Sequence, residues 1–307
     1  MSAQAAVPTR TAVMSQAGHE NFPVASRLLG RRDRGHLLAI YGFARLVDDI
    51  GDEAEGNRLA LLDWVEEEVG RVYAGETPEH PVMRALASTV RASGLPPGPF
   101  RRLIEANRSD QVVGRYATFD ELLDYCWLSA APVGELVLHV FGAASAERIA
   151  LSDKICAGLQ VTEHLQDVAE DYARGRVYLP TEDLARFGCD EDDLGAAATT
   201  PELRALIAFE ADRARTLLAD GAPLARRLPP RPALAVTAFV AGGGAALDAL
   251  ARAGYDVFGA RPRPTRRAFL AAFAVSMTPW PRTRKTRGAV RARPEAEPPT
   301  SSGVIPR

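Results

Sequence analysis

The stretch LQVTEHLQDVAEDYARGRVYLP, at residues 159–180, decides how this chain can fold. Its hydrophobic spacing predicts a helix over 159–172 with one apolar face and one acidic face. Polar groups on the acidic face recur every three or four residues, so they stack one helical turn apart. Stacked acids repel one another unless positive charge lies against them. The stripe of Gln160, Glu163, Asp167 and Asp171 therefore favours cation binding.

A second acidic stripe lies far upstream, in AIYGFARLVDDIGDE at residues 39–53. Asp48 and Asp52 are four residues apart, with Asp49 between them, and a helix separates such Cα atoms by about 6 Å along its axis. Carboxylates at that spacing can bracket Mg²⁺, which proteins hold through a few carboxylates together with phosphate oxygens and water. One such pair is ordinary surface chemistry. Two pairs on apolar helices, with Arg45, Arg174 and Arg176 nearby, predict a Mg²⁺–diphosphate clamp if the helices face each other.

The composition is that of a soluble, mainly helical protein. Of 307 residues, 47% are hydrophobic and 25% are charged, which is enough for a large core in one domain or two small ones. The net charge of −2 gives no general indication of nucleic-acid binding. The three cysteines are widely spaced without a Cys-x-x-Cys pair, which argues against a disulfide scaffold or zinc site and fits a reducing cytoplasm.

The two ends of the chain differ from its middle. Residues 1–18 are small and polar, so we expect a disordered tail without a signal-peptide pattern. The longest uncharged run, 233–247, is shorter than the roughly 20 residues of a membrane span. Residues 282–307 are rich in proline and arginine and are expected to be disordered; a solvated tail is the simpler interpretation, and weak attraction to anionic lipid is the alternative.

Between the tails, periodicity and turn residues predict a series of helices. Thr118 is expected to cap one of them, with Glu121 completing a capping box, and Ser152 is expected to cap the helix of the 159–172 stripe. The break at 130–132 predicts either backbone that borders a cavity or a simple turn between helices. Glycines 242–244 lack the context of a dinucleotide site and indicate close helix packing or a kink. The predicted helices span 33–52, 59–73, 81–93, 100–107, 122–129, 133–141, 152–172, 182–187, 190–194, 201–227, 233–253 and 265–277.

These motifs together resemble the squalene/phytoene synthases, the head-to-head prenyl synthases. The resemblance rests on the two acidic motifs, the GRVYLP sequence at 175–180, the YCxxxxxxVG pattern at 125–134 and YDVF at 255–258. It covers about residues 19–277. ENFPVAS at 20–26 and SAAPVG at 129–134 are most similar to the hydroxysqualene synthases of the hopanoid pathway.

The resemblance implies an all-α isoprenoid synthase fold, with a single catalytic domain over 19–281 around a central apolar cavity. It also implies that Asp48, Asp49, Asp52, Asp167 and Asp171 bind Mg²⁺ and diphosphate, and that Arg45 contacts the diphosphate. Glu163 stands where the family commonly has asparagine, and we expect it to be a metal ligand or a close neighbour of one. Tyr41 is expected to act in catalysis, among candidate aromatic lining residues that include Phe43 and Phe141. The other expected substrate contacts are Phe22, Tyr125, Val133, Gly134, Gln160, Arg176, Tyr255 and Arg261.

The implied reaction is Mg²⁺-dependent ionisation of presqualene diphosphate, followed by water capture to give hydroxysqualene. A squalene or phytoene synthase condensing two farnesyl or geranylgeranyl diphosphates is the nearest alternative. A head-to-tail prenyl synthase or terpene cyclase, and a non-catalytic scaffold on the same fold, are further ones. The expected partners are an isoprenoid diphosphate, a presqualene diphosphate synthase and the membrane surface, with no nucleic acid. The expected location is the cytoplasm, including the inner face of the membrane.

Overall fold

The computed structural model describes residues 7–15, 30–259 and 273, and these residues form helices and connecting loops without a β-strand. The prediction of an all-α fold is confirmed. The predictions for Phe22, Arg261, the helix at 265–277 and the tail at 282–307 lie outside the described residues. The helices are α1 (Arg10–Ser15), α2 (Arg31–Asp52), α3 (Arg58–Ala74), α4 (Pro81–Ser93), α5 (Gly98–Ser109), α6 (Phe119–Ser129), α7 (Ala131–Val140), α8 (Ala146–Gln166), α9 (Val168–Ala173), α10 (Thr181–Phe187), α11 (Pro201–Gly221) and α12 (Pro230–Arg252), with 3₁₀ turns η3 (Glu191–Gly195) and η4 (Ala222–Arg227).

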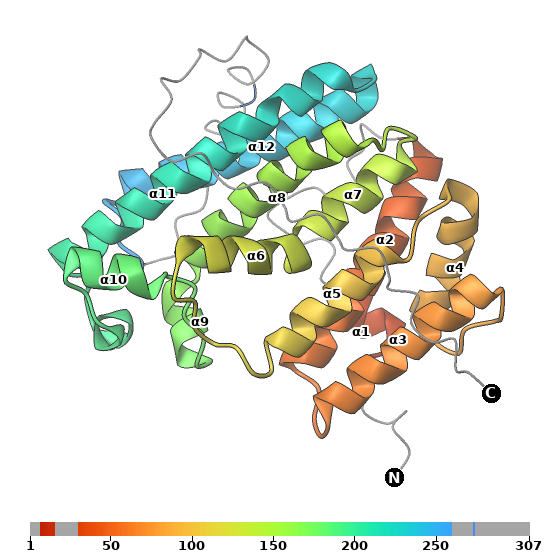
Figure 1. Cartoon of the computed structure of the whole chain (residues 1–307), viewed down its shortest axis with the longest axis horizontal. Helices are drawn as coiled ribbons and strands as arrows, with labels where there is room; N and C mark the ends of the chain where they lie inside the picture. The colour runs from red at the N-terminus through yellow and green to blue at the C-terminus, as the bar shows by residue number, and fades with distance from the viewer. Residues whose placement is uncertain (1–6, 16–29, 260–272, 274–307) are drawn as a thin grey trace, which may run out of the picture.

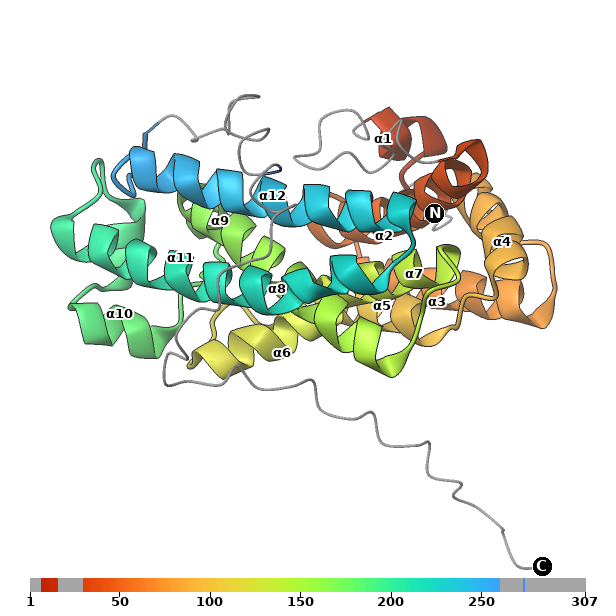
Figure 2. The same cartoon turned by 90° about the horizontal axis from the view of Figure 1, so that it is seen from above.

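The helices form two packed groups, and α8 lies within the first of them. One core joins α6, α8, α10, α11 and α12, and the other joins α1 to α5. Figures 1 and 2 show α11 and α12 running alongside α8 on one side of the molecule and α2 to α5 gathered on the other, with α6 and α7 between the groups. Leu37 of α2 and Ala235 of α12 join the two groups in a smaller apolar cluster.

Part of the N-terminal tail that we expected to be disordered is helical. Thr9 Oγ1 accepts a hydrogen bond from Ala12 N (3.3 Å) at the start of α1. Val13 is fully buried in the core that contains α2, and Met14 Sδ would lie 3.2 Å from a Cβ at Gly42. The apolar pair at 13–14 therefore docks α1 on α2, a tertiary contact that composition does not indicate.

The helix carrying the second acidic motif is longer at its start and shorter at its end than predicted. It begins at Ala146, and its N-cap is Ser145 rather than Ser152. Residues 146–151 contain no helix breaker, so the helix extends through them and Ser152 is buried inside it. The helix ends at Gln166, because Asp167 leaves helical geometry (φ −113°, ψ 13°), and α9 begins one residue later.

The predicted break between α6 and α7 is present at Ala130, two residues before Pro132. Thr118 caps α6 by accepting a hydrogen bond from Glu121 N (3.2 Å). The predicted capping box is only half formed, since Glu121 Oε2 binds Ala117 N (2.7 Å) instead of the N–H of Thr118. The glycine run in α12 packs closely as expected: a Cβ at Gly243 would lie 2.7 Å from Leu159 Cδ2.

α12 has the length and apolar composition of a membrane span, with a mean hydropathy of 1.7. However, 72% of its most apolar window is buried within the protein, as in a core helix.

The three cysteines are free thiols.

Candidate active site

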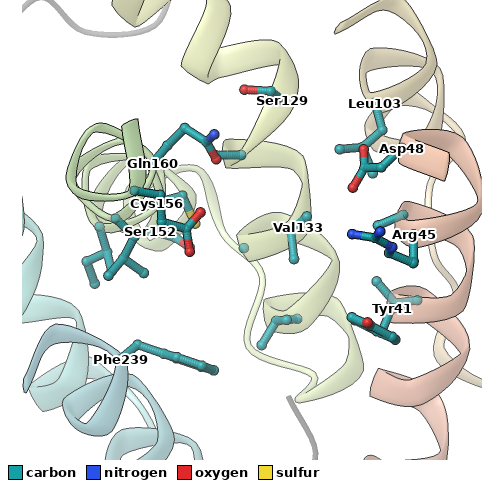
Figure 3. Close-up of a pocket in the computed structure, with 18 of the residues that line it drawn as sticks. Tyr41, Arg45, Asp48, Leu103, Ser129, Val133, Ser152, Cys156, Gln160 and Phe239 are labelled. Carbon is teal, nitrogen blue, oxygen red and sulfur yellow. The ribbon is translucent and has the colours of Figure 1, made fainter. Parts of the chain in front are cut away.

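A cavity of about 530 Å³ lies between the two helix groups, bordered by α2, α5, α6, α7, α8 and α12. Figure 3 shows α2 side chains facing α8 side chains across it, with Phe239 of α12 projecting in from a third side. Both acidic motifs contribute to its wall. The break at Ala130 also borders it, as do Ser129, Val133 and Gly134, so this break belongs to a cavity wall rather than to a simple turn.

The first motif presents one stripe of α2 to the cavity. Tyr41, Arg45, Asp48 and Asp52 all border it, as expected for residues spaced three or four apart on a helix. Asp49 points elsewhere: it is only 5% exposed, and its Oδ1 lies 2.7 Å from Arg45 Nε. The structure therefore does not place Asp49 with the cavity-facing carboxylates, because adjacent helical residues point about 100° apart.

Asp48 is held by Asn107 of α5, a residue that the sequence did not indicate. Asn107 Nδ2 donates to Asp48 Oδ1 (3.2 Å) and to Leu103 O (3.2 Å). The pKa of Asp48 is raised to about 7, chiefly by burial; the Asn107 hydrogen bond opposes the rise and the charge of Asp52 adds to it. Asp48 is accessible to solvent from the cavity, but protein surrounds it elsewhere, and this is why its charge is costly without a cation. Gly51 makes the contact possible, since a Cβ there would overlap Asn107 Oδ1.

The second motif lines the facing wall. Gln160 and Glu163 project from the last turns of α8, Asp167 lies at the break, and Asp171 follows on α9, all bordering the cavity. His164 lies among them, with its Nδ1 3.9 Å from Asp171 Oδ2 and its ring stacked on Tyr178 at 3.7 Å. Burial lowers the His164 pKa, so the ring is neutral near neutral pH.

Arg176 connects the two motifs. Its Nη2 lies 2.7 Å from Asp52 Oδ1, and its backbone N–H donates to Asp171 O (2.9 Å). The turn before it needs Gly175, whose φ is +81°. Arg174 also borders the cavity and pairs with Glu170 (2.8 Å). The GRVYLP sequence thus places a guanidinium group between the two acidic walls.

A further carboxyl group at the cavity, Asp110, was not predicted from the sequence. Tyr125 donates its hydroxyl hydrogen to Asp110 Oδ2 (2.9 Å), and both residues border the cavity. Burial raises the Asp110 pKa to about 6, against the lowering effects of Tyr125 and Arg176. Asp110 follows the last residue of α5 without a repeated acidic pattern, so no local signal marked it.

The rest of the cavity wall is mainly apolar and aromatic. It includes Phe141, as expected, whereas Phe43 is fully buried in the neighbouring core. Tyr255 does not border the cavity; it has a left-handed backbone (φ 57°) and packs against the core around α11. Its predicted phosphate contact is therefore not supported by its position. The apolar and aromatic wall residues include Leu37, Ile40, Val137, Phe141, Ala235, Val236 and Phe239.

The donor chemistry fits Mg²⁺, although the carboxylates lie on two separate walls. Within the described residues, no three His, Cys, Asp or Glu side chains converge closely enough to hold one ion. Oxygen ligands from both walls suit a cation that also binds phosphate oxygens and water. The raised pKa of Asp48 indicates that a negative charge on this carboxyl group is unfavourable, and a bound cation would stabilise that charge. The residues that would hold it are Asp48, Asp52, Glu163, Asp167 and Asp171.

Comparisons of sequence and structure relate this fold to known proteins. The squalene/phytoene synthase family model matches residues 15–268. A hydroxysqualene synthase of Rhodopseudomonas palustris is 42% identical over 216 residues, covering 68% of this chain and 71% of that protein. A 15-cis-phytoene synthase of Synechococcus elongatus is 33% identical over 253 residues, covering 78% and 82%. The crystal structure of squalene synthase HpnC from Alicyclobacillus acidocaldarius superimposes with a TM-score of 0.74 at 46% identity, covering 79% of this chain and 92% of that one. This chain belongs to the squalene/phytoene synthase family of enzymes.

Proposed function

We propose that this enzyme ionises presqualene diphosphate with Mg²⁺ and directs water to the resulting cation, releasing hydroxysqualene and diphosphate. The observation that carries the proposal is the pairing of two acidic walls, on α2 and on α8 and α9, with an otherwise apolar cavity. Similarity to the R. palustris hydroxysqualene synthase supports the choice of substrate and product.

The acidic part of the cavity would bind the diphosphate. Bound Mg²⁺ supplies positive charge that stabilises the leaving group. Asn107 fixes the Asp48 carboxylate by its hydrogen bond, and Arg176 keeps a guanidinium group beside Asp52. A planar guanidinium can donate two hydrogen bonds to phosphate oxygens, which supports a role of Arg176 in holding the diphosphate between the walls.

The apolar part would protect the cation. Water there would trap it before rearrangement, so a wall of aliphatic and aromatic side chains delays capture. Tyr41, Phe141 and Phe239 border this region, and their rings can also stabilise positive charge. Figure 3 shows Tyr41 and Phe239 projecting into the cavity from opposite sides.

Two polar groups could orient the water that ends the reaction. Ser129 donates its hydroxyl hydrogen to Tyr125 O (3.1 Å), which leaves its oxygen free to accept. The Gln160 amide nitrogen lies 3.3 Å from His164 Nε2, so its carbonyl oxygen is free to accept as well. A water molecule that donates both hydrogens to such acceptors presents a lone pair to the cation. Both side chains project into the cavity in Figure 3.

The testing experiment is a product assay on the purified protein. Presqualene diphosphate and farnesyl diphosphate are supplied separately, with and without Mg²⁺ and with and without NADPH. We expect hydroxysqualene from presqualene diphosphate in the presence of Mg²⁺ alone. Conversion of farnesyl diphosphate alone to a C30 product would refute the proposal.

The second candidate is condensation of two farnesyl or geranylgeranyl diphosphates. It is favoured by the similarity to the S. elongatus phytoene synthase, which covers more of the chain at lower identity. The same assay distinguishes the two, with geranylgeranyl diphosphate as an additional substrate.

A further inference from the structure

Arginine side chains gather where α2 and α12 begin. α2 starts with Arg31 and Arg32, η4 carries Arg226, and α12 starts with Pro230 and Arg231. All four arginines are exposed. The two helix starts adjoin, since Arg231 Nη1 would lie 4.0 Å from a Cβ at Gly30. Figure 1 shows both helices beginning at the same end of the molecule, at the upper right. We call Arg31, Arg32, Arg226 and Arg231 the arginine end.

Asp33 lies beside the arginine end, since its Oδ2 would lie 3.8 Å from the same Gly30 Cβ as Arg231 Nη1, but it forms no ion pair with the four arginines in the described chain. None of the four takes part in an ion pair there, although the neighbouring Arg227 pairs with Glu147. The whole chain has a net charge of −2, so this cluster is a local concentration of positive charge and not part of a generally basic protein.

The positions of these arginines are unfavourable for the helices themselves. A helix N-terminus carries partial positive charge and is stabilised by acidic residues, while basic residues are favoured at the C-terminus. Here Arg31, Arg32 and Arg231 occupy first turns, and Asp33 is the acidic residue in the first turn of α2. Helix stability therefore does not explain the position of these arginines, whereas binding of an external anionic partner would explain it.

The arginine end adjoins the apolar part of the cavity. Leu37 and Ala235 follow the arginines by one to two turns, pack in one cluster and border the cavity. From Leu37, the cavity-lining stripe of α2 continues through Tyr41 and Asp48 to Asp52, a distance of about 22 Å along the helix. The cavity thus has an acidic end and, along α2, an apolar end next to the arginines.

We propose that the arginine end docks on an anionic lipid bilayer. Guanidinium groups pair with lipid phosphates, and basic residues near a membrane surface are attracted to anionic headgroups. This orientation would place the apolar end of the cavity next to the bilayer, where long isoprenoid chains partition. The choice of a membrane as partner rests on the isoprenoid substrate class of the proposed function, but binding itself does not require catalysis.

The test is flotation of the full-length protein with vesicles, in the absence of substrate. Phosphatidylcholine vesicles are compared with phosphatidylcholine–phosphatidylglycerol vesicles at low and high salt. The test variant is R31Q/R32Q/R231Q. The matched control is R91Q/R101Q/R252Q, because these three arginines are also exposed and without an ion pair in the described chain. A third variant, R287Q/R291Q/R293Q, neutralises part of the basic C-terminal sequence.

We expect wild type and control to bind the anionic vesicles and to be released by salt. The R31Q/R32Q/R231Q variant should bind them on the order of a hundredfold more weakly, since each arginine near the surface contributes about fivefold. Its diphosphate release in detergent should equal that of wild type, which shows that it is folded. The proposal is overturned if R31Q/R32Q/R231Q binds anionic vesicles as strongly as the control, if the C-terminal variant alone loses binding, or if the wild-type protein does not bind anionic vesicles. A failed product assay with intact vesicle binding would overturn only the proposed reaction.

Discussion

Replacing Asn107 by leucine tests whether the cavity depends on a residue that no motif indicates. Leucine has a similar size but cannot donate a hydrogen bond. Asp48 Oδ1 would lose its amide donor, and Leu103 O would lose a second hydrogen bond within α5. Asn107 is only 6% exposed, so water cannot easily take the place of the amide.

The expected magnitude follows from that hydrogen bond. A hydrogen bond to a charged group contributes about 1.5–3 kcal/mol, and each 1.36 kcal/mol corresponds to a tenfold change in rate. We therefore expect kcat/KM to fall by roughly ten- to a hundredfold. The hydrogen bond also lowers the Asp48 pKa, which burial raises to about 7. Without it the pKa rises further, so more Asp48 is protonated at neutral pH and the Mg²⁺ requirement increases as pH falls.

The assay is diphosphate release from presqualene diphosphate as a function of Mg²⁺ concentration and pH. The matched control is Gln111→Leu, which removes an amide that joins α5 to α2 through Gly51 O (3.0 Å) but does not touch Asp48. Thermal unfolding checks that both variants fold. If Asn107→Leu is no less active than Gln111→Leu, or if its Mg²⁺ and pH dependence match wild type, the assigned role of Asn107 is incorrect.

Three further predictions concern other parts of the structure. Asp171→Asn should reduce diphosphate release by at least about a hundredfold, because it removes a cavity-facing carboxylate. The control Glu170→Gln changes a side chain that is paired with Arg174 and should keep near wild-type activity. Equal losses of activity in the two variants would contradict the two-wall site. Ser129→Ala should leave diphosphate release unchanged but lower the share of hydroxylated product, measured by mass spectrometry, and an unaltered product ratio would exclude Ser129 from water binding. Burial raises the Glu210 pKa from 4.5 to about 8, so the folded protein retains a proton that the unfolded chain releases, and stability falls as pH rises through that window. Glu210→Gln should remove the Glu210 share of this decline, which is on the order of 5 kcal/mol across the window, and leave the shares of Asp48 and Asp110. A denaturation midpoint whose pH dependence matches wild type would refute it.

Local sequence patterns predicted most of the helices, because hydrophobic spacing and turn residues act over a few positions. The limits of α4 were predicted at both ends, and the break between α6 and α7 was predicted from the run of small residues and proline at 130–132. The start of α8 was not, because Ser152 resembled an N-cap while the preceding residues could equally continue the helix. The docking of α1 through Val13 depends on a groove made by other helices, so composition alone indicated a disordered tail.

The sequence by itself determined that two acidic stripes lie on helices, because a period of three to four residues places Asp48 with Asp52, and Gln160 with Glu163, on one side. Only the tertiary structure decided that the side of α2 carrying Asp48 and Asp52 faces the cavity, whereas the contact of Asp49 with Arg45 is a local pair one turn apart on the same helix. The same holds for the residues that support the site. Asn107 reaches Asp48 across 59 positions, and Arg176 reaches Asp52 from the far side of the cavity. Such contacts depend on how whole helices pack, and packing is a property of distant segments that no local pattern records.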